Sequence, residues 1–257
     1  MKCRKINLQN RRERETYSYK LKDLEKEFTY PLGDKEFYIS HGLYADYFSF
    51  FEQLGKPEFL VLEDGDNVIG VVCLILRTIN GKQTWYACDF KISKAYRGQK
   101  LYRKWMWKFF LPYYIKCQLL FGINMSSPEN NKLWKHTQSI FKVFSIDVKP
   151  HYLYEFTANE LGLLDDNIIN NYSLITNNGV KDIIVEGNPV SLYHLVEKNH
   201  LKNNLPHYNI VDKNQLNDND SIMLLVQDKK EISFAKESVI SFIHRKNPNI
   251  YLSSAEI

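Results

Sequence analysis

Two short turns in the first third of the chain restrict how this region can fold. Asp64-Gly65 separates the apolar runs EFLVLED and NVIGVVCLILRTI, and Asn80-Gly81 separates the second run from QTWYACDFKIS. Asp-Gly and Asn-Gly pairs favour the tight turns between antiparallel strands, because glycine tolerates a positive φ. The sequence therefore predicts three successive antiparallel strands that lead into residues 88–105.

The segment CDFKISKAYRGQKLYRKW, residues 88–105, takes the third strand into a predicted helix with an apolar face and a basic face. A helix start offers free backbone N–H groups and about half a positive charge, and both favour phosphate. An arginine at the turn adds a planar charged fork, and a glycine lets a ligand approach the backbone. The turn is a predicted anion site, suited best to a diphosphate, that consists of Arg97, Gly98, Gln99 and Lys100.

Predicted helices and strands alternate around this turn. A helix at 43–55 comes before the three strands, and a strand at 117–125 and a helix at 128–141 follow the turn. Two further strands end at about residue 156. The strand–helix–strand segment at 84–125 predicts two parallel, neighbouring strands.

The predicted fold class is α/β, with a mixed sheet flanked by helices and then a smaller C-terminal α/β unit. Residues 1–27 are predicted as a basic extension, residues 28–156 as the main domain, and residues 157–257 as the smaller unit, with helices at 189–199 and 231–244. A basic extension can bind nucleic acid or an anionic membrane. Acidic residues interleave here without an aromatic stacking pattern, which favours a solvated extension instead.

Composition excludes several classes of protein. The formal charge of +4 is too small to indicate a nucleic-acid binder, and the longest apolar run, VIGVVCLIL, is too short for a membrane helix. The four cysteines lack Cys-x-x-Cys spacing, and the first 25 residues have no apolar core of a secretory signal. We therefore expect a soluble cytoplasmic protein with unpaired cysteines. The histidines show no ligand spacing, so no metal site is expected.

The segment DFKISKAYRGQKL resembles motif A of the GNAT superfamily, the GCN5-related N-acetyltransferases. Arg97 matches the first position of that motif and Gly98 the glycine that often follows it. The preceding strand matches the family at its acidic, apolar, apolar and aromatic positions, which are Asp89, Phe90, Ile92 and Tyr96. The resemblance covers residues 28–156, and Lys100 and Tyr102 stand where the family has two further glycines.

The resemblance implies acetyl-CoA as a co-substrate. Its pyrophosphate would bind at the predicted anion site, close to Tyr102, and its pantetheine arm would lie along strand 86–91, which includes Phe90 and leads to Ile92. Aromatic residues of the helix at 43–55 would line the acceptor site, with Tyr44 and Tyr47 as candidates. These rings would otherwise pack the helix on the sheet.

The resemblance also implies the chemistry of acyl transfer. Asp89 stands where many members keep a base or a water-holding carboxylate, although it would equally suit a surface strand. The family's thiol-protonating tyrosine is matched by Trp134, whose indole N–H cannot act as that acid. His136, two residues later, is a weak candidate for a substitute acid or base and would otherwise be a surface or capping residue.

The sequence thus predicts an acyl-CoA-dependent N-acyltransferase, an N-acetyltransferase in which a small-molecule or peptide amine attacks acetyl-CoA directly. The alternative is a catalytically inactive GNAT-like module that binds a macromolecular partner or a nucleotide. Neither membranes nor nucleic acids are expected partners, and a homodimer is compatible with the sequence. Residues 157–257 would cap the acceptor side, contribute to a dimer, or represent a degenerate second GNAT-like half.

Overall fold

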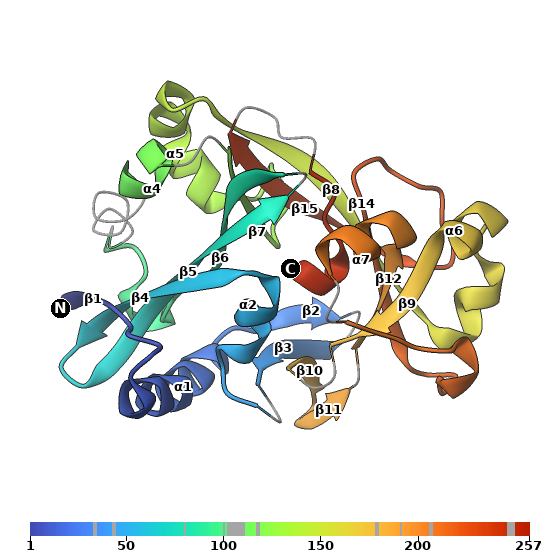
Figure 1. Ribbon diagram of the computed structural model, residues 1–257, viewed down its shortest axis with the longest axis horizontal. Coiled ribbons are helices and arrows are strands. Elements are labelled where there is room, and N and C mark those ends of the chain that lie inside the picture. Colours follow the sequence, from blue (N-terminus) through green and yellow to red (C-terminus); the bar gives the residue numbers. More distant parts are fainter. Residues whose placement is uncertain are drawn as a thin grey trace. The chain divides into compact units, whose positions relative to one another are not determined.

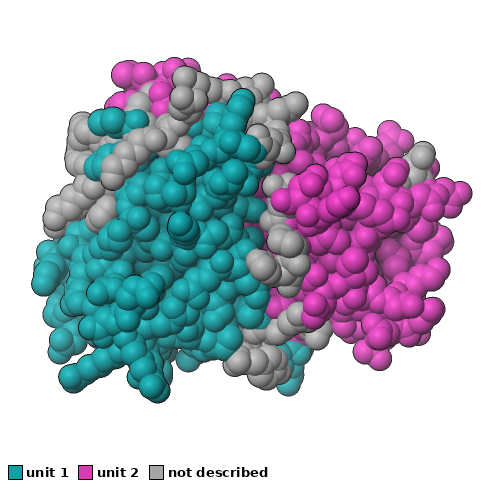
Figure 2. Space-filling view, viewed as in Figure 1, with its two compact units in different colours: residues 1–120, 179–189 teal, residues 121–178, 190–257 magenta. Residues whose placement is uncertain are grey.

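The computed structural model covers residues 1–257 and describes all of them except 33–34, 43–44, 80, 100, 102–110, 117–118, 178–179, 191, 206–207 and 246–249. Strands and helices form two compact units (Figures 1 and 2), so the fold class is α/β, as predicted. Unit 1 comprises residues 1–120 and 179–189, and unit 2 comprises residues 121–178 and 190–257. The border between the units lies between residues 120 and 121, and residues 179–189 belong to unit 1 together with the N-terminal part of the chain.

The first sheet of unit 1 is built around the three predicted strands. These are β4 (Lys56–Asp64), β5 (Asn67–Ile79) and β6 (Lys82–Ile92), and they pair antiparallel in sequence order. Gly65 adopts φ +59° in the β4–β5 turn, as the Asp-Gly signal requires. Strand β1 (Lys2–Lys5) adds antiparallel to the free edge of β4.

A second sheet of unit 1 combines residues from distant parts of the chain. Strand β3 (Lys35–His41) pairs antiparallel with both β2 (Tyr30–Leu32) and β10 (Lys181–Val185). Strand β11 (Asn188–Val190) follows β10 at the edge of the sheet. The helices that the structure describes in this unit are α1 (Arg11–Glu25), α2 (Ser49–Leu54), α4 (Leu111–Lys116) and the 3-10 helix η1 (Lys94–Tyr96).

Residues 1–27 are not the solvated extension that their charge predicted. They form β1 and α1, and the side chain of Asn10 caps α1 by accepting from the Glu13 N–H. Tyr17, Leu21 and Leu24 follow one helical face and are buried, and α1 packs against β3 and β5. The many charges around this narrow apolar stripe concealed the helix in the sequence.

The strands of unit 2 are neighbours in a mixed sheet, in the order β7-β15-β8-β14-β12-β9-β13. The strand pairs that the structure describes in this unit are antiparallel, except for β12 with β14, which is parallel. The strands are β7 (Leu119–Asn124), β8 (Ile146–Thr157), β9 (Tyr172–Thr176), β12 (Leu192–Glu197), β13 (Asn209–Ile210), β14 (Ser221–Val226) and β15 (Lys236–Arg245). The helices are α5 (Lys132–Val143), α6 (Asp166–Asn171), α7 (Lys198–Asn204), η3 (Ala158–Leu163), η4 (Lys213–Gln215) and η5 (Ser254–Glu256).

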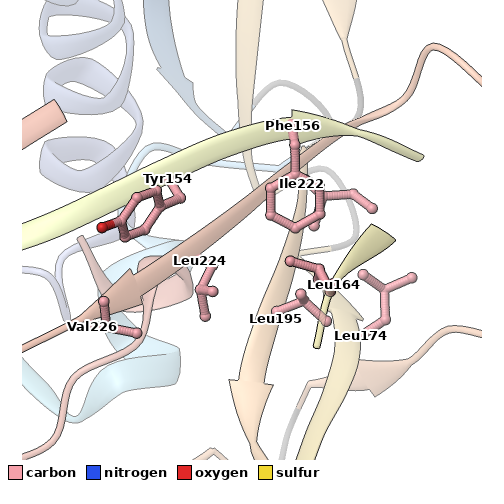
Figure 3. Packing of buried hydrophobic residues seen from close by; sticks show 8 residues of the cluster. All are labelled: Tyr154, Phe156, Leu164, Leu174, Leu195, Ile222, Leu224 and Val226. Carbon is pink, nitrogen blue, oxygen red and sulfur yellow. The ribbon is translucent and has the colours of Figure 1, made fainter. Parts of the chain in front are cut away.

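One side of the unit 2 sheet carries a buried hydrophobic cluster (Figure 3). Strand β14 is buried along its whole length, which explains its continuous apolar run. Side chains from β8, β9, β12, β14 and the segment after η3 meet in this cluster. Its buried members are Tyr154, Phe156, Leu164, Leu174, Leu195, Ile222, Leu224 and Val226.

Three predicted helices differ from the structure. The helix predicted at 43–55 is limited to Ser49–Leu54, because Asp46 accepts from the N–H groups of the next turn and starts the helix late. The segment predicted as helix at 189–199 contains β12, and α7 begins only at Lys198. Most of the segment predicted as helix at 231–244 is β15, since its apolar residues find partners on β7 and β8.

The structure also bears on the cysteines and on the question of a membrane-spanning helix. Cys3, Cys73 and Cys88 form no disulfide among the described residues, and Cys117 lies outside them. Among the helices that the structure describes, none has the length and hydropathy needed to cross a membrane.

The burial of α1 predicts the effect of truncating its apolar face. Leu21 is 0% exposed, so Leu21→Ala should lower the free energy of unfolding by about 2–5 kcal/mol, measured by urea denaturation. Tyr19→Ala is the control, because Tyr19 on the same helix is 77% exposed. Equally small effects of the two substitutions would contradict the packing of α1.

Candidate functional site

Strand β6 departs from regular pairing close to its end. Val71 lies opposite Lys91 and Cys73 lies opposite Cys88, so two residues of β6 face one residue of β5 between these pairs. The first of the two, Asp89, has φ +52°, in the left-handed region that residues with a side chain rarely adopt. A β-bulge of this kind bends the strand and redirects its side chains.

An exposed turn after β6 holds three of the predicted anion-binding residues. The Arg97 Nε donates to the Ile92 carbonyl oxygen at 3.0 Å, and the guanidinium carbon lies 5.2 Å from the centre of the Phe28 ring. Gly98 has φ +82°, and a Cβ at this position would meet no atom within 4 Å. Arg97, Gly98 and Gln99 are all exposed. A ligand can therefore reach both the side chains and the backbone of this turn.

Lys91 lies at the centre of a buried cluster of polar side chains in unit 1. Its Nζ donates to Asp89 Oδ1 at 2.5 Å and to Glu25 Oε1 at 2.6 Å. The Tyr47 hydroxyl donates to Asp89 Oδ2 at 2.6 Å, and His41 Nδ1 lies 2.6 Å from Glu25 Oε1. The side chains of Lys91, Glu25 and Asp89 are 7%, 3% and 2% exposed. We call these five residues the Lys91 cluster.

The charges of the Lys91 cluster offset the cost of burying them. Burial raises the pKa of Glu25, but His41 and Lys91 outweigh it and bring that pKa to about 2. Burial lowers the pKa of Lys91, but Asp89 and Glu25 together raise it above its ordinary value. Burial and the charge of Asp89 raise the pKa of Tyr47 well above its ordinary value. At neutral pH, Glu25 and Lys91 are therefore charged and Tyr47 is neutral.

Lys181 is a second buried cation of unit 1. It lies opposite His41 in the β10–β3 ladder, is 3% exposed, and has its Nζ 4.9 Å from the centre of the Phe50 ring. Burial and then the charge of Lys91 lower its pKa to about 8. The contact with the ring offsets part of the burial cost. Lys181 is thus a cation that the fold holds at a net cost.

The Lys91 cluster contains three groups that are able to ligate a metal ion. Within the described part of the chain, Glu25, His41 and Asp89 bring ligand atoms within 4.8 Å of one another. The Lys91 ammonium bonds both carboxylates and so supplies the positive charge that a metal ion would bring. These residues fit an internal ion pair better than a metal centre.

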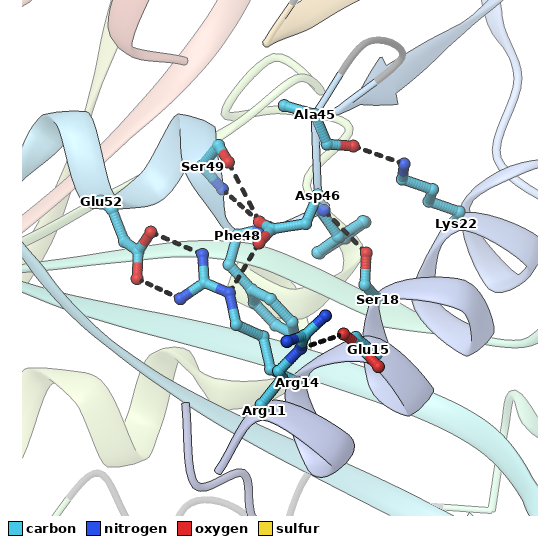
Figure 4. Close-up of polar contacts among 11 residues, drawn as sticks. Arg11, Arg14, Glu15, Ser18, Lys22, Ala45, Asp46, Phe48, Ser49 and Glu52 are labelled. Atoms are coloured by element: carbon cyan, nitrogen blue, oxygen red, sulfur yellow. Dashed lines mark hydrogen bonds and ion pairs between the residues drawn. The ribbon is translucent and has the colours of Figure 1, made fainter. Parts of the chain in front are cut away.

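The segment that carries Tyr47 lies beside an open cleft of about 490 Å³. Figure 4 shows the polar contacts that fix this segment against α1. Arg14 donates to both carboxylate oxygens of Glu52 at 2.7 Å and to Asp46 at 2.6 Å. The Ser18 hydroxyl accepts from the Tyr47 N–H at 2.9 Å, and the Lys22 ammonium donates to the Ala45 carbonyl at 2.7 Å. These contacts hold Tyr47 in position to reach Asp89.

The structure brings together two of the predicted site residues, Asp89 and Tyr47. Tyr47 is 0% exposed, so it contributes through its hydroxyl and not as an open wall of an acceptor pocket. Of the two predicted pantetheine contacts at the end of β6, Phe90 is 41% exposed and Ile92 is half-buried. Three predicted residues, Tyr44, Lys100 and Tyr102, lie outside the described residues. His136 belongs to α5 in unit 2.

Sequence reasoning missed Glu25, His41, Lys91 and Lys181. Glu25 was hidden in the presumed extension, and Lys181 lies far along the chain in another strand. No sequence signal marked Lys91, because strand alternation between Phe90 and Ile92 predicts a solvent-facing lysine. The bulge at Asp89 changes the face, so that Lys91 is buried and Phe90 is exposed.

Neither a family model nor a curated protein matches the sequence. The structure is similar to a tandem GNAT protein from the clavulanic acid biosynthesis pathway, with 10% identity and a TM-score of 0.46 over 94% of this chain and 98% of that chain. It is also similar to a GCN5-related N-acetyltransferase from Kribbella flavida, with 9% identity and a TM-score of 0.33 over 72% and 59% of the two chains. Naa50 from Arabidopsis thaliana is similar as well, with 12% identity and a TM-score of 0.37 over 59% of this chain and 87% of that chain. GNAT proteins are among the structures to which this fold is similar.

The Lys91 cluster predicts a large effect of removing one charge. Glu25→Gln leaves Lys91 with one carboxylate partner in a buried site, so the free energy of unfolding should fall by roughly 3–5 kcal/mol in urea denaturation. Glu15→Gln removes an exposed ion pair with Arg11 on the same helix and should change stability little. Similar values for the two variants would contradict the proposed importance of the cluster.

The lowered pKa of Lys181 predicts that the stability difference between the wild type and Lys181→Met depends on pH. The folded-state pKa of about 8 lies below the ordinary value of 10.5, so the burial cost is complete below pH 8 and disappears as the pH rises towards 10.5. Lys181→Met should therefore stabilise the fold by up to roughly 3 kcal/mol at pH 7, with a gain that shrinks above pH 8. Urea denaturation between pH 7 and 10 measures the difference. Lys181→Arg keeps its charge and should instead lose stability relative to the wild type over this interval.

Proposed function

We propose that this protein is an acyl-CoA-dependent N-acyltransferase that transfers an acetyl group from acetyl-CoA to an acceptor amine. The observation that carries the proposal is that the end of β6 combines a bulge at Asp89 with an open turn at Arg97 and Gly98. A bulge and an exposed glycine turn both let a ligand approach backbone groups. The sequence resemblance to GNAT motif A covers the same residues.

The turn would bind the diphosphate of acetyl-CoA. Arg97 is exposed and has further guanidinium N–H groups beyond the Nε that holds Ile92. Gly98 leaves open space where another residue would place its Cβ, so phosphate oxygens could approach the backbone. Gln99 adds an exposed amide beside them. Phe90, exposed on the strand before the turn, would contact the pantetheine arm.

The acyl transfer itself needs one proton to leave the acceptor ammonium before its nitrogen attacks the thioester carbonyl carbon. The C–S bond then breaks, the nitrogen loses a second proton as the amide forms, and the CoA sulfur takes up one proton to become the free thiol. Because the Asp89 side chain is 2% exposed and bonds Lys91 and Tyr47, its role would be to hold a water or to orient Tyr47. The sequence predicted Asp89 as either a base or a water-holding carboxylate, and its burial makes the role of a base in direct contact with the acceptor the less favoured one.

A second candidate function is a GNAT-like binding module without catalysis. The observation that favours it is that both carboxylate oxygens of Asp89 already have partners inside the protein. The turn at Arg97 would still bind a nucleotide in this case. The homodimer, the cytoplasmic location and the role of His136 remain predictions from the sequence.

Thermal unfolding with and without acetyl-CoA tests the proposed cofactor site. At about a hundred times the dissociation constant, acetyl-CoA should stabilise the wild type by about 2.7 kcal/mol. Arg97→Ala should lose most of this stabilisation, whereas Arg11→Ala, which removes an exposed arginine of α1, should keep it. Absence of stabilisation in the wild type would overturn the acyl-CoA proposal.

Release of the free CoA thiol in the presence of an amine panel separates the two functions. An acyltransferase should release thiol at a rate that depends on the amine, and Tyr47→Phe and Asp89→Asn should slow it without abolishing acetyl-CoA binding. Stabilisation by acetyl-CoA without thiol release from any amine would favour the binding module.

A further inference from the structure

A cavity of about 400 Å³ lies within unit 2. Residues of η3, α6, β9 and β12 line it, together with the segment 210–214. Leu164, Leu174 and Leu195, which Figure 3 shows close together in the hydrophobic cluster, form part of its wall. The volume lies within the range of small-molecule sites in proteins, about 300–1,000 Å³. The cavity therefore connects the solvent with the core of unit 2.

The lining of this cavity is predominantly aliphatic. Leu164, Leu174 and Leu195 are 6%, 7% and 5% exposed, so they form its buried part. Ile169 and Ile210 also line it, and they are 41% and 68% exposed. An apolar ligand would remove these two side chains from water and gain the hydrophobic contribution of its own chain. Leucine and isoleucine side chains suit a flexible saturated chain.

The lining also includes polar groups, which are those of Tyr172, Ser173, Lys213 and Asn214. Among its described lining residues Lys213 is the one with a charged side chain, and Asn214 is next to it. The neighbouring Asp212 is turned to the start of η4, where its carboxylate accepts from the Asn214 N–H at 2.9 Å. A ligand with an apolar chain and a negative end would match both the aliphatic wall and the lysine.

We propose that this cavity binds an anionic amphiphile of the fatty-acid class. The saturated chain lies against Leu164, Leu174 and Leu195, and the carboxylate lies next to Lys213. The site belongs to unit 2, whereas the turn at Arg97 belongs to unit 1, so the proposal does not depend on the acyltransferase function. A neutral apolar ligand would leave Lys213 without a role.

Calorimetric titration with saturated carboxylates tests the aliphatic part of the site. Octanoate, decanoate and dodecanoate should bind the full-length protein saturably, below the concentrations at which they aggregate. The dissociation constant should fall roughly tenfold for each pair of added methylene groups, because each buried methylene contributes about 0.8 kcal/mol. Absence of saturable binding, or an affinity independent of chain length, would overturn the proposal.

Two matched variants test the location of the chain. Gly162 lines the cavity, and a Cβ there would meet no atom within 4 Å, so Gly162→Trp should fill the cavity without disturbing the core. It should weaken dodecanoate at least tenfold. Leu163→Trp places the same side chain one residue along, at a position that is 65% exposed and outside the lining, and should bind as the wild type does. Unchanged binding in Gly162→Trp would place dodecanoate elsewhere and overturn the site.

The charge of Lys213 is tested separately with a neutral probe. Lys213→Glu should weaken dodecanoate severalfold and leave dodecanol unaffected, whereas Lys202→Glu on α7 should affect neither. Equal binding of dodecanoate and dodecanol to the wild type would overturn the anionic class of the ligand. Thermal unfolding of each variant without ligand confirms that the comparison concerns folded protein.

Discussion

The ammonium of Lys91, held between the carboxylates of Glu25 and Asp89, is the interaction on which unit 1 depends. It joins α1 to the end of β6, and through Glu25 it also reaches β3, because His41 bonds the same carboxylate. Burying ions is costly, and a buried ion pair is often no more stabilising than apolar residues of the same size. Its contribution is therefore to specify one arrangement of these segments, since any other would leave a charge unpaired.

The cluster explains how β6 keeps its bulge. A left-handed backbone at a residue with a side chain costs about 1–3 kcal/mol and persists where the surroundings determine it. Asp89 is held at both carboxylate oxygens, by Lys91 and Tyr47, and Tyr47 is fixed in turn by Ser18 of α1. Asp89 is thus bonded directly to the segment of Tyr47, and it is connected to α1 through Lys91 and Tyr47. The chain beyond it then reaches the exposed turn at Arg97 in a fixed direction.

The sequence predicted those parts of the fold that local patterns determine. Asp64-Gly65 joined two strands as expected, because a tight turn needs few residues to specify it. The segment 236–245 was predicted within a helix and forms β15, because its neighbours β7 and β8 come from more than eighty residues earlier in the chain. The pair Glu25 and Lys91 is separated by 66 residues, and no local pattern connects them. Asp89 and Tyr47 were found through the family resemblance, without their mutual hydrogen bond.

The distribution of charge along β6 and the following turn connects the structure with the proposed function. In the Lys91 cluster, the carboxylates of Glu25 and Asp89 neutralise the positive charge of Lys91. The ammonium is therefore not available to attract an anionic ligand. The turn is different, because Arg97 is exposed and follows a further exposed cation, Lys94. An anionic cofactor would therefore be attracted to the turn and not to the Lys91 cluster. Arg97 follows Asp89 by eight residues, so one short stretch of the chain carries both the buried, compensated charges and the exposed cations.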